Sequence, residues 1–302
     1  MRYTLFILLL LLSLQAHSIP PYEREGLEDK PVPSSATTTP PPYGEGLGGS
    51  PRMHSTLYGF GFSNVLDTYL SPYSYKGIEA RVIRQTARRT KLWQGRISYH
   101  TQIDFNAAYV KNPAKNVKEY AGGIRYSNAW LYNFTPLPDG SPHRGGDVRR
   151  TEGVSLAVGP AASGYLGCIY NNRNGNNPAQ ARVDVMIDLT AQVAYRFRVG
   201  RRHWLAKYDL AVPFLGVAFS PQYGQSYYEM FSLKDYDHNC VFANPVNMPS
   251  MRHLLTVDIP IGHNQLRVGY AGEFMQSKFN GLRYHSYSHN LMIGFTKYFV
   301  RK

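Results

Sequence analysis

The chain has 302 residues, of which 43% are hydrophobic, 14% aromatic and 18% charged, a composition that argues against a disordered protein. Lys and Arg outnumber Asp and Glu by 33 to 20, and the net charge of +13 is compatible with nucleic acid, an anionic membrane surface or a phosphate-bearing ligand as partner. Beyond the N-terminal segment no apolar run reaches the roughly 18–20 residues of a membrane-spanning helix, so the sequence predicts no helical membrane protein.

The N-terminal segment has the pattern of a secretory signal peptide. Arg2 provides a positive charge, Leu5–Leu12 form a short apolar core, and Ala16-His17-Ser18 is a small-x-small cleavage signal. We therefore expect residues 1–18 to be removed on export. Residues 19–55 are rich in Pro, Gly, Ser and Thr, which predicts a disordered periplasmic tether.

From Thr56 almost to the end of the chain, apolar and polar residues alternate with a period of two. In Val183–Val199 one face carries Val, Ile, Leu, Tyr and Phe, whereas the other carries mostly Arg, Asp, Thr and Gln. Seventeen residues exceed the usual length of a strand in a soluble sandwich. The predicted strands are Thr56–Leu66, Lys76–Arg88, Trp93–Tyr109, Lys118–Phe134, Thr151–Gly159, Val183–Val199, Trp204–Ser220, Met251–Ile261, Gln265–Ser277 and Leu282–Val300.

These segments predict an all-β fold, a transmembrane antiparallel up-and-down β-barrel of about ten strands (eight to twelve) over residues 56–302. A soluble lectin-like double sheet, with its apolar face inward, is the competing fold. Alternation of link lengths favours the barrel, because tight links such as Gly262-His263-Asn264 alternate with predicted outer loops at Pro160–Ala181 and Pro221–Ser250. The link Thr135–Arg150 is the exception, since it is long for a periplasmic turn.

Aromatic residues gather at the predicted strand ends and at the C-terminus. Tyr298 and Phe299 close the last strand, a mark that barrel-assembly machinery reads. The predicted interfacial girdles contain Tyr58, Phe60, Trp93, Tyr109, Tyr132, Phe134 and Trp204. We therefore expect a monomer in the bacterial outer membrane, with barrel-assembly machinery, lipopolysaccharide and inner-leaflet phospholipid as partners and no nucleic acid.

Much of the positive charge falls on the predicted periplasmic rim. Its basic residues are Arg88, Arg89, Lys91, Arg149, Arg150, Arg201, Arg202, Arg301 and Lys302. A basic rim can meet anionic inner-leaflet headgroups, so the charge favours a membrane surface over nucleic acid.

Four segments resemble a family of uncharacterised exported proteins of Bacteroidetes, classed as a domain of unknown function. They are Gly216–Gly224, Asp235–Asn239, Leu266–Tyr270 and Tyr284–His289. The resemblance covers about residues 56–302 and implies an outer-membrane barrel without an assigned activity, so it carries over no catalytic residues.

The last predicted strand holds the residue types of an outer-membrane phospholipase. Such an enzyme activates a serine with a histidine on the same strand face, supported by an asparagine. His285, Ser288 and Asn290 provide these types, but Tyr287 occupies the position where the serine is needed. Polar residues at a membrane rim are the favoured interpretation.

The longest predicted outer loop holds Asp235, Asp237 and His238, the residue types with which omptin proteases activate water. The link across the barrel mouth carries lysines, among them Lys111 and Lys115, where a second acidic pair would be needed. A solvated loop is therefore favoured over a proteolytic site, and a rim-located hydrolase is kept as the alternative function.

The sequence predicts no metal site and no other cofactor. His285 and His289 share a strand face, but four residues along a strand separate them by about 13 Å, too far for one ion. Cys168 and Cys240 fall in two predicted outer loops, where an oxidising compartment permits either a disulfide or two free thiols.

Acids and bases are nearly balanced on the predicted inward faces. We expect them to interlock as ion pairs in a mostly filled lumen, with a narrow polar pore as the alternative. The predicted lumen residues are Glu79, Arg81, Arg96, Asp104, Arg125, Asp184, Asp188, Arg196, Asp209, Asp258, Arg267 and Glu273. The expected function is that of a surface-exposed structural or binding protein, whose outer loops are its working surface.

Overall fold

The structure is a computed structural model that describes residues 51–135, 152–175, 177–261 and 264–300. The predicted signal peptide, most of the tether and the link at 136–151 lie outside these ranges. The long strands are β1 (Pro51–Asp67), β2 (Tyr75–Arg89), β3 (Ile97–Lys111), β4 (Lys118–Asn133), β5 (Gly153–Asn171), β6 (Ala179–Val199), β7 (Arg202–Phe219), β9 (Met251–Ile261), β10 (Asn264–Phe279) and β11 (Leu282–Val300).

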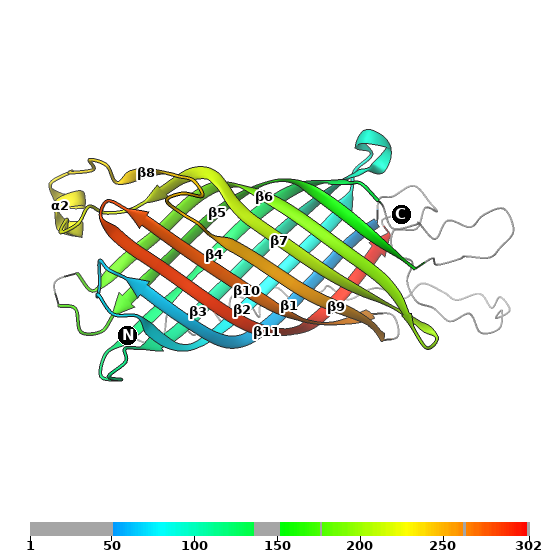
Figure 1. Cartoon of the computed structure of the whole chain (residues 1–302), viewed down its shortest axis with the longest axis horizontal. Coiled ribbons are helices and arrows are strands. Elements are labelled where there is room, and N and C mark those ends of the chain that lie inside the picture. The colour runs from blue at the N-terminus through cyan, green and yellow to red at the C-terminus, as the bar shows by residue number, and fades with distance from the viewer. Residues whose placement is uncertain (1–50, 136–151, 176, 262–263, 301–302) are drawn as a thin grey trace, which may run out of the picture. The chain divides into compact units, whose positions relative to one another are not determined.

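These ten strands form a closed antiparallel ring (Figure 1). Each strand pairs with its neighbours in the order β6-β5-β4-β3-β2-β1-β11-β10-β9-β7, and pairing of β6 with β7 completes the circle. A short strand, β8 (Cys240–Ala243), pairs only with Gly216–Phe219 at the end of β7. The predicted barrel is confirmed, and the lectin-like double sheet is wrong because the sheet closes on itself.

The two ends of the barrel differ in their links. Pro51 of β1 pairs with Val300 of β11, so the first strand begins and the last strand ends at the same end of the barrel (Figure 1). We call this the terminal end. The opposite, distal end carries the link 220–250, which contains β8 and the short helix α2 (Tyr227–Ser232). At the terminal end the β6–β7 and β9–β10 links are short, as is typical of outer-membrane barrels, whereas the β4–β5 link, residues 134–152, is the long exception that the sequence predicts.

Strand β5 corrects the sequence prediction. The segment Pro160–Ala181 was predicted to be an outer loop, but β5 continues through Pro160 to Asn171, and only residues 172–178 link it to β6. Pro160 lacks an N–H, and the pairing of β4 with β5 is interrupted beside it, between Tyr132↔Val158 and Ala129↔Ala161. A Cβ on Gly159 would lie 1.9 Å from the carbonyl oxygen of Trp130, so the interruption needs a glycine.

Two strand starts also differ from the prediction. β1 begins at Pro51 rather than Thr56, within the predicted tether. β3 begins at Ile97 rather than Trp93, because Leu92–Gly95 form a 3-10 turn in which Trp93 and Gln94 have positive φ of 49° and 57°. Positive φ breaks the extended backbone on which alternation depends.

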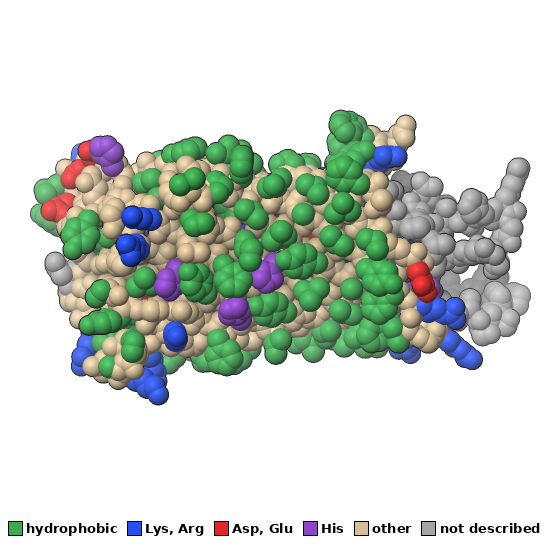
Figure 2. Space-filling model, in the orientation of Figure 1, with side chains coloured by type: hydrophobic (Ala, Val, Ile, Leu, Met, Phe, Trp, Pro, Cys, Tyr) green, Lys and Arg blue, Asp and Glu red, His purple; other side chains and the backbone are tan. Residues whose placement is uncertain are grey.

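The apolar face of the strands points outward. On β6, Val185, Ile187 and Leu189 are 54–60% exposed, whereas the alternate residues Asp184 and Asp188 are 6% and 1% exposed. Figure 2 shows hydrophobic side chains over the visible wall of the barrel, with most Lys and Arg toward its ends. This is the inversion expected when lipid, rather than water, surrounds the wall.

Aromatic side chains cluster on the outside near the terminal end. Tyr132 contacts Trp93 and Phe134, with ring centroids 5.7 and 5.0 Å apart, and Phe197 lies 6.2 Å from Trp204. Such a band is typical of the membrane interface. Of the other predicted girdle residues, Tyr58 and Phe60 are exposed but lie inside β1 rather than at its end. None of the described helices is long and apolar enough to cross a membrane.

Candidate functional site

Arg81 of β2 is the hub of a buried ion-pair network in the lumen. Its guanidinium donates to both carboxylate oxygens of Asp104, at 2.8 and 2.7 Å, and also to Glu273. Its Nη1 atom donates to the Ser288 hydroxyl at 3.0 Å and lies 3.8 Å from the carboxylate of Glu79. Burying a guanidinium is tolerated only with such partners, so the network is an organised feature of the lumen.

The network crosses the full width of the barrel. Arg125 of β4 lies 3.9 Å from Glu273 of β10 and 3.1 Å from Asp184 of β6. Four strands separate β4 from β10 in either direction around the ring, so these two residues come from opposite walls. Side chains from opposite walls in contact mean that the lumen is closed at this level.

Further ion pairs lie on either side of this level. Arg267, which has no exposed surface, donates to Asp258 through Nε and Nη2 at 2.5 and 2.6 Å. Arg252 of β9 pairs with Asp188 of β6 across the intervening β7. Asp209 is held by Lys207 at 3.0 Å and by the amide of Gln192 at 2.6 Å. Most of the predicted lumen residues are therefore brought together.

Arg96 is the exception among the predicted lumen residues. It is exposed in the link before β3 and donates to the hydroxyl of Tyr132 at 3.0 Å. The prediction extended β3 through the turn at Leu92–Gly95, where alternation is lost. Arg196 is buried on the inward face of β6, as its position in the strand predicts.

The charged lumen residues that the prediction missed include Arg252, Asp67 and the fully buried Glu119. Arg252 shares the inward face of β9 with Asp258, and the same alternation that identified Asp258 would have found it. Asp67 at the end of β1 lies 3.8 Å from Arg182, and the Arg182 guanidinium lies 3.6 Å from the ring centre of Tyr284. Asp67 was missed because the predicted strand stopped at Leu66.

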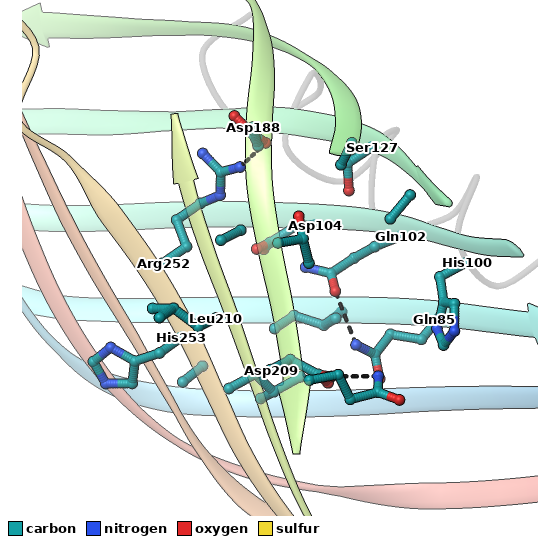
Figure 3. A pocket seen from close by; sticks show the side chains of 18 of the residues that line it. Gln85, His100, Gln102, Asp104, Ser127, Asp188, Asp209, Leu210, Arg252 and His253 are labelled. Atoms are coloured by element: carbon teal, nitrogen blue, oxygen red, sulfur yellow. Dashed lines mark hydrogen bonds and ion pairs between the residues drawn. The ribbon is translucent and has the colours of Figure 1, made fainter. Parts of the chain in front are cut away.

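A lumen cavity with a volume of about 90 Å³ lies between the network and the terminal end (Figure 3). Asp104, Asp188 and Arg252 line it on the network side, and His100 and Asp209 line it further along. The cavity has room for several water molecules, and it ends at the ion pairs of the network. Figure 3 shows a hydrogen bond in the lining of the cavity, which the Gln85 side chain donates to Gln102. Its length is 2.9 Å.

The phospholipase-like residues do not form a site. His285 is on the outward face of β11, stacked on Tyr287 with ring centroids 4.5 Å apart. Ser288 is buried inside the barrel against Arg81, and Asn290 donates to Glu79 at 2.9 Å. The barrel wall therefore separates the histidine from the serine, and a base cannot reach its nucleophile through it.

The loop carboxylates and histidine lie on the distal surface. Asp237 Oδ2 is 2.8 Å from His238 Nδ1, and both side chains are at least 70% exposed. Asp235 lies in the same segment, where its backbone carbonyl accepts a hydrogen bond from Gln225 at 2.9 Å. The pair is solvated, in contrast to the desolvated setting of most catalytic dyads.

The cysteines are free thiols in this structure. Cys168 lies on the exposed face of β5, not in a loop, and Cys240 is the first residue of β8. The prediction that both belong to loops is wrong for Cys168, because β5 continues past Pro160. The bridge that the sequence permitted is not formed here. Among the described residues, no cluster of His, Cys, Asp and Glu is arranged to hold a metal ion.

Helix α2 and its flanks form a structured platform at the distal end. The Tyr227 hydroxyl donates to Gln180 at 3.0 Å and accepts from the backbone N–H of Ala181 at 2.6 Å, and its ring packs edge-on against Tyr69 at 6.0 Å. Asn239 donates to Gln225 at 2.7 Å. The contacts of Tyr227 tie the link 220–250 to β6 and to the β1–β2 link, and the bond between Asn239 and Gln225 joins two parts of the link itself. The exposed apolar residues of the platform are Tyr223, Tyr228, Phe231, Leu233 and Tyr236.

A capping box holds the start of α2. Ser226 accepts from the Glu229 backbone N–H at 3.2 Å, and the Ser226 backbone N–H donates to the Glu229 carboxylate at 2.6 Å. This backbone bond, with the Ser226 hydroxyl, holds the pKa of Glu229 below its usual value.

Replacing Ser226 with Ala should destabilise the local fold of α2 by about 1 kcal/mol, because the hydroxyl no longer accepts from the Glu229 backbone N–H or donates to the Glu229 carboxylate. Hydrogen exchange of the α2 amides, followed by mass spectrometry on the folded protein, should accelerate by roughly fivefold. Ser232→Ala, at the exposed last residue of the helix, is the matched control. Equal exchange in Ser226→Ala and the wild type would show that the cap does not hold the platform.

Comparison with protein families gives one match. The family described as "Protein of unknown function (DUF3316)" matches residues 4–302, almost the whole chain. The chain belongs to the DUF3316 family. This agrees with the resemblance to a domain of unknown function, and the Bacteroidetes lineage stays a prediction. A search of curated protein sequences finds no match to this DUF3316 chain.

Several solved structures are similar to the DUF3316 chain at low sequence identity. Neisserial surface protein A is 12% identical, with 82% of this chain and 96% of that chain covered and a TM-score of 0.29. The COG4313 outer membrane channel from Pseudomonas putida F1 is 12% identical, with 87% and 100% covered and a TM-score of 0.33. The translocator domain of the autotransporter NalP from Neisseria meningitidis is 9% identical, with 82% and 89% covered and a TM-score of 0.36.

Proposed function

We propose that this protein is a bacterial outer-membrane barrel with a closed lumen, which presents its distal platform as a binding surface outside the cell. In this proposal the terminal end faces the periplasm and the chain reaches the membrane through a cleaved signal peptide, residues 1–18. Barrel-assembly machinery inserts it, and it works as a monomer without a cofactor.

The outward apolar face supports a membrane location. A soluble protein rarely exposes contiguous apolar surface of this extent, whereas a barrel in lipid requires it. Exposed apolar side chains occur on strands all around the ring, for example Phe60 on β1, Phe105 on β3, Leu166 on β5 and Leu291 on β11. The inward faces carry the charged network, which matches the polar interior of such barrels.

The contact between Arg125 and Glu273 carries the proposal of a closed lumen. These residues come from opposite walls and meet at 3.9 Å, and Arg81 joins the same carboxylate from a third strand. A barrel filled by its own side chains supports the membrane-spanning part as a scaffold rather than a channel. The binding function then belongs to the parts of the protein outside the membrane.

The platform supports a binding role. Tyr228, Phe231 and Tyr236 are 56–68% exposed on a segment that is fixed by hydrogen bonds. Exposed aromatic side chains on a preorganised loop are typical of protein-binding surfaces, because little entropy is lost when a partner docks.

A narrow pore is the second candidate. A cavity of about 40 Å³ near the terminal end shares Met53, His100, Gln192 and Lys207 with the cavity of about 90 Å³. The two adjoining cavities give a partial path from the terminal end up to the ion-pair network. A rearrangement of the network would be needed to extend it, so the closed barrel is preferred.

Cell fractionation tests the location. We expect the full chain, expressed with its N-terminal segment in a Gram-negative host, to be recovered in the outer-membrane fraction. The folded barrel should also migrate differently from the boiled protein on a gel, since detergent-resistant barrels retain their compact form until heated. Recovery as a soluble protein without heat-modifiable mobility would overturn the proposal, and a resident outer-membrane barrel in the same gel serves as the control.

A further inference from the structure

Three lysines lie side by side on the outward face near the distal end. Lys76 of β2 is paired with Lys111 of β3, and Lys111 is paired with Lys118 of β4. We call these three residues the lysine ladder. Residues directly paired across strands have Cβ atoms about 4.5–5.5 Å apart, and like charges in such positions repel. An anion bound over the three lysines would relieve this repulsion.

In the described residues no carboxylate pairs with the lysine ladder. The nearest acid in sequence, Glu119, is fully buried on the inward side and bonded to Asn171 at 2.9 Å. Lys115 and Arg173, exposed in the adjoining links, add two further positive charges.

The link that carries Lys115 is held in one conformation. The Asn112 side chain accepts from the backbone N–H groups of Asn116 and Val117, at 3.0 and 3.1 Å. Lys115 has a φ of 57°, in the left-handed region that a lysine seldom adopts. Asn172, from the neighbouring link, accepts from the Lys118 backbone N–H at 3.0 Å. The cations at this site are therefore carried on an ordered frame.

Below the lysine ladder the same outward face becomes aromatic and then aliphatic. The rings of Tyr109 and Tyr120 are 5.4 Å apart, and Lys111 Nζ lies 5.5 Å from the centre of the Tyr109 ring. Ile78 is exposed at the level of the two tyrosines, because it is paired with Tyr109, and Phe105 and Ile124 are exposed two outward positions nearer the middle of the barrel. This order matches that of a membrane lipid. The cations correspond to its phosphate groups, the tyrosines to its glycerol or sugar, and the apolar side chains to its acyl chains.

We infer that the lysine ladder, with Lys115 and Arg173, binds the phosphate groups of a phosphorylated glycolipid in the outer leaflet, whose acyl chains lie along Ile78, Phe105 and Ile124. The inference rests on the proposed function, because it needs the distal end at the outer leaflet. A free phosphate would use the cations but not the apolar surface below them, so a lipid is the better match. Three ammonium groups on a rigid frame supply charge-assisted hydrogen bonds to phosphate oxygens.

The test uses purified full-length protein in neutral detergent and bisphosphorylated lipid A as the probe, with binding measured by native mass spectrometry. The variant is the triple Lys76→Gln, Lys111→Gln, Lys118→Gln. The matched control removes the same number of charges from the terminal end, by Arg88→Gln, Lys91→Gln and Arg201→Gln. Single Lys111→Gln, the middle position, is a milder version of the same change.

We expect the triple variant to bind lipid A about tenfold or more weakly than the wild type and the control variant, with Lys111→Gln in between. Enzymatically dephosphorylated lipid A should bind the wild type as weakly as lipid A binds the triple variant. Equal binding by the triple variant and the wild type would overturn the inference, as would displacement of lipid A by equimolar inorganic pyrophosphate. Heat-modifiable mobility of every variant shows that the barrel has folded, so failure of the lipid site is distinguished from failure of the proposed outer-membrane function.

Discussion

Replacing Asp258 with Asn is expected to lower the free energy of unfolding of the barrel by about 3–5 kcal/mol, because it leaves the Arg267 guanidinium buried without its counter-ion. Arg267 has no exposed surface, and its other hydrogen bonds, to Gln85 at 3.2 Å and to the Met53 sulfur at 3.6 Å, involve uncharged groups. Reversible urea unfolding in lipid vesicles, followed by tryptophan fluorescence, measures the change.

Two further variants make this prediction sharp. Removing both charges by Asp258→Leu with Arg267→Met should restore most of the stability, since a buried pair replaced by apolar residues of similar volume is often neutral or stabilising. Asp237→Asn is the control, because its ion pair with His238 is exposed and such pairs contribute about 0–1 kcal/mol. A loss below about 1 kcal/mol for Asp258→Asn would mean that water reaches Arg267 and that the lumen is more open than proposed.

Removing the contact between opposite walls is expected to turn a silent barrel into a conducting one. In planar bilayers the wild-type protein should show no steady openings, because Arg125 and Glu273 meet inside the lumen. The double variant Arg125→Ser, Glu273→Ser keeps the net charge and removes the two side chains that meet from opposite walls. It should give repeated single-channel steps, since water and small ions then pass the level of the network.

The control for conductance is Lys207→Ser with Asp209→Ser. This pair, 3.0 Å apart, lies on one strand and does not cross the lumen. We expect it to stay silent. Steady openings of the wild type would contradict the closed lumen and favour the narrow pore, and silence of the Arg125/Glu273 variant would show that other side chains close the barrel. Folding of each variant is checked by heat-modifiable gel mobility.

Alternation along the chain was sufficient to predict the barrel. In β6 every second residue from Val183 to Val199 is apolar or aromatic, and the structure turns this face outward and the charged face inward. A period of two leaves only two faces to choose between. The length of the strand then favours a membrane barrel over a sandwich.

Local composition misled the prediction where small residues are used for packing. The segment after Pro160 contains Ala, Ser and Gly, which are typical of loops, yet it forms the second half of β5. There Gly167 leaves room for the Tyr165 hydroxyl, which would lie 2.6 Å from a Cβ at that position. Small residues serve turns and close strand contacts equally, and only the neighbouring strand distinguishes them.

Lumen residues could be identified individually from their strand positions, but their partners could not. The strand position of Asn290 predicts an inward side chain but not its bond to Glu79, and it does not predict that Glu273 is shared by Arg81 and Arg125. These contacts join strands that are far apart in the chain. Which side chains meet depends on how many strands close the ring and on their stagger, neither of which is written in any single segment.

The chain alone thus establishes the barrel, its inverted faces and the identity of most charged residues that enter the lumen, because each of these follows from a local period of two. Closure adds the rest. It brings Arg125 against Glu273 across the lumen, sets Ser288 of β11 against Arg81 of β2, and aligns Lys76, Lys111 and Lys118 on neighbouring strands. These arrangements depend on strand register, which is fixed by pairing over the whole ring rather than by any one strand.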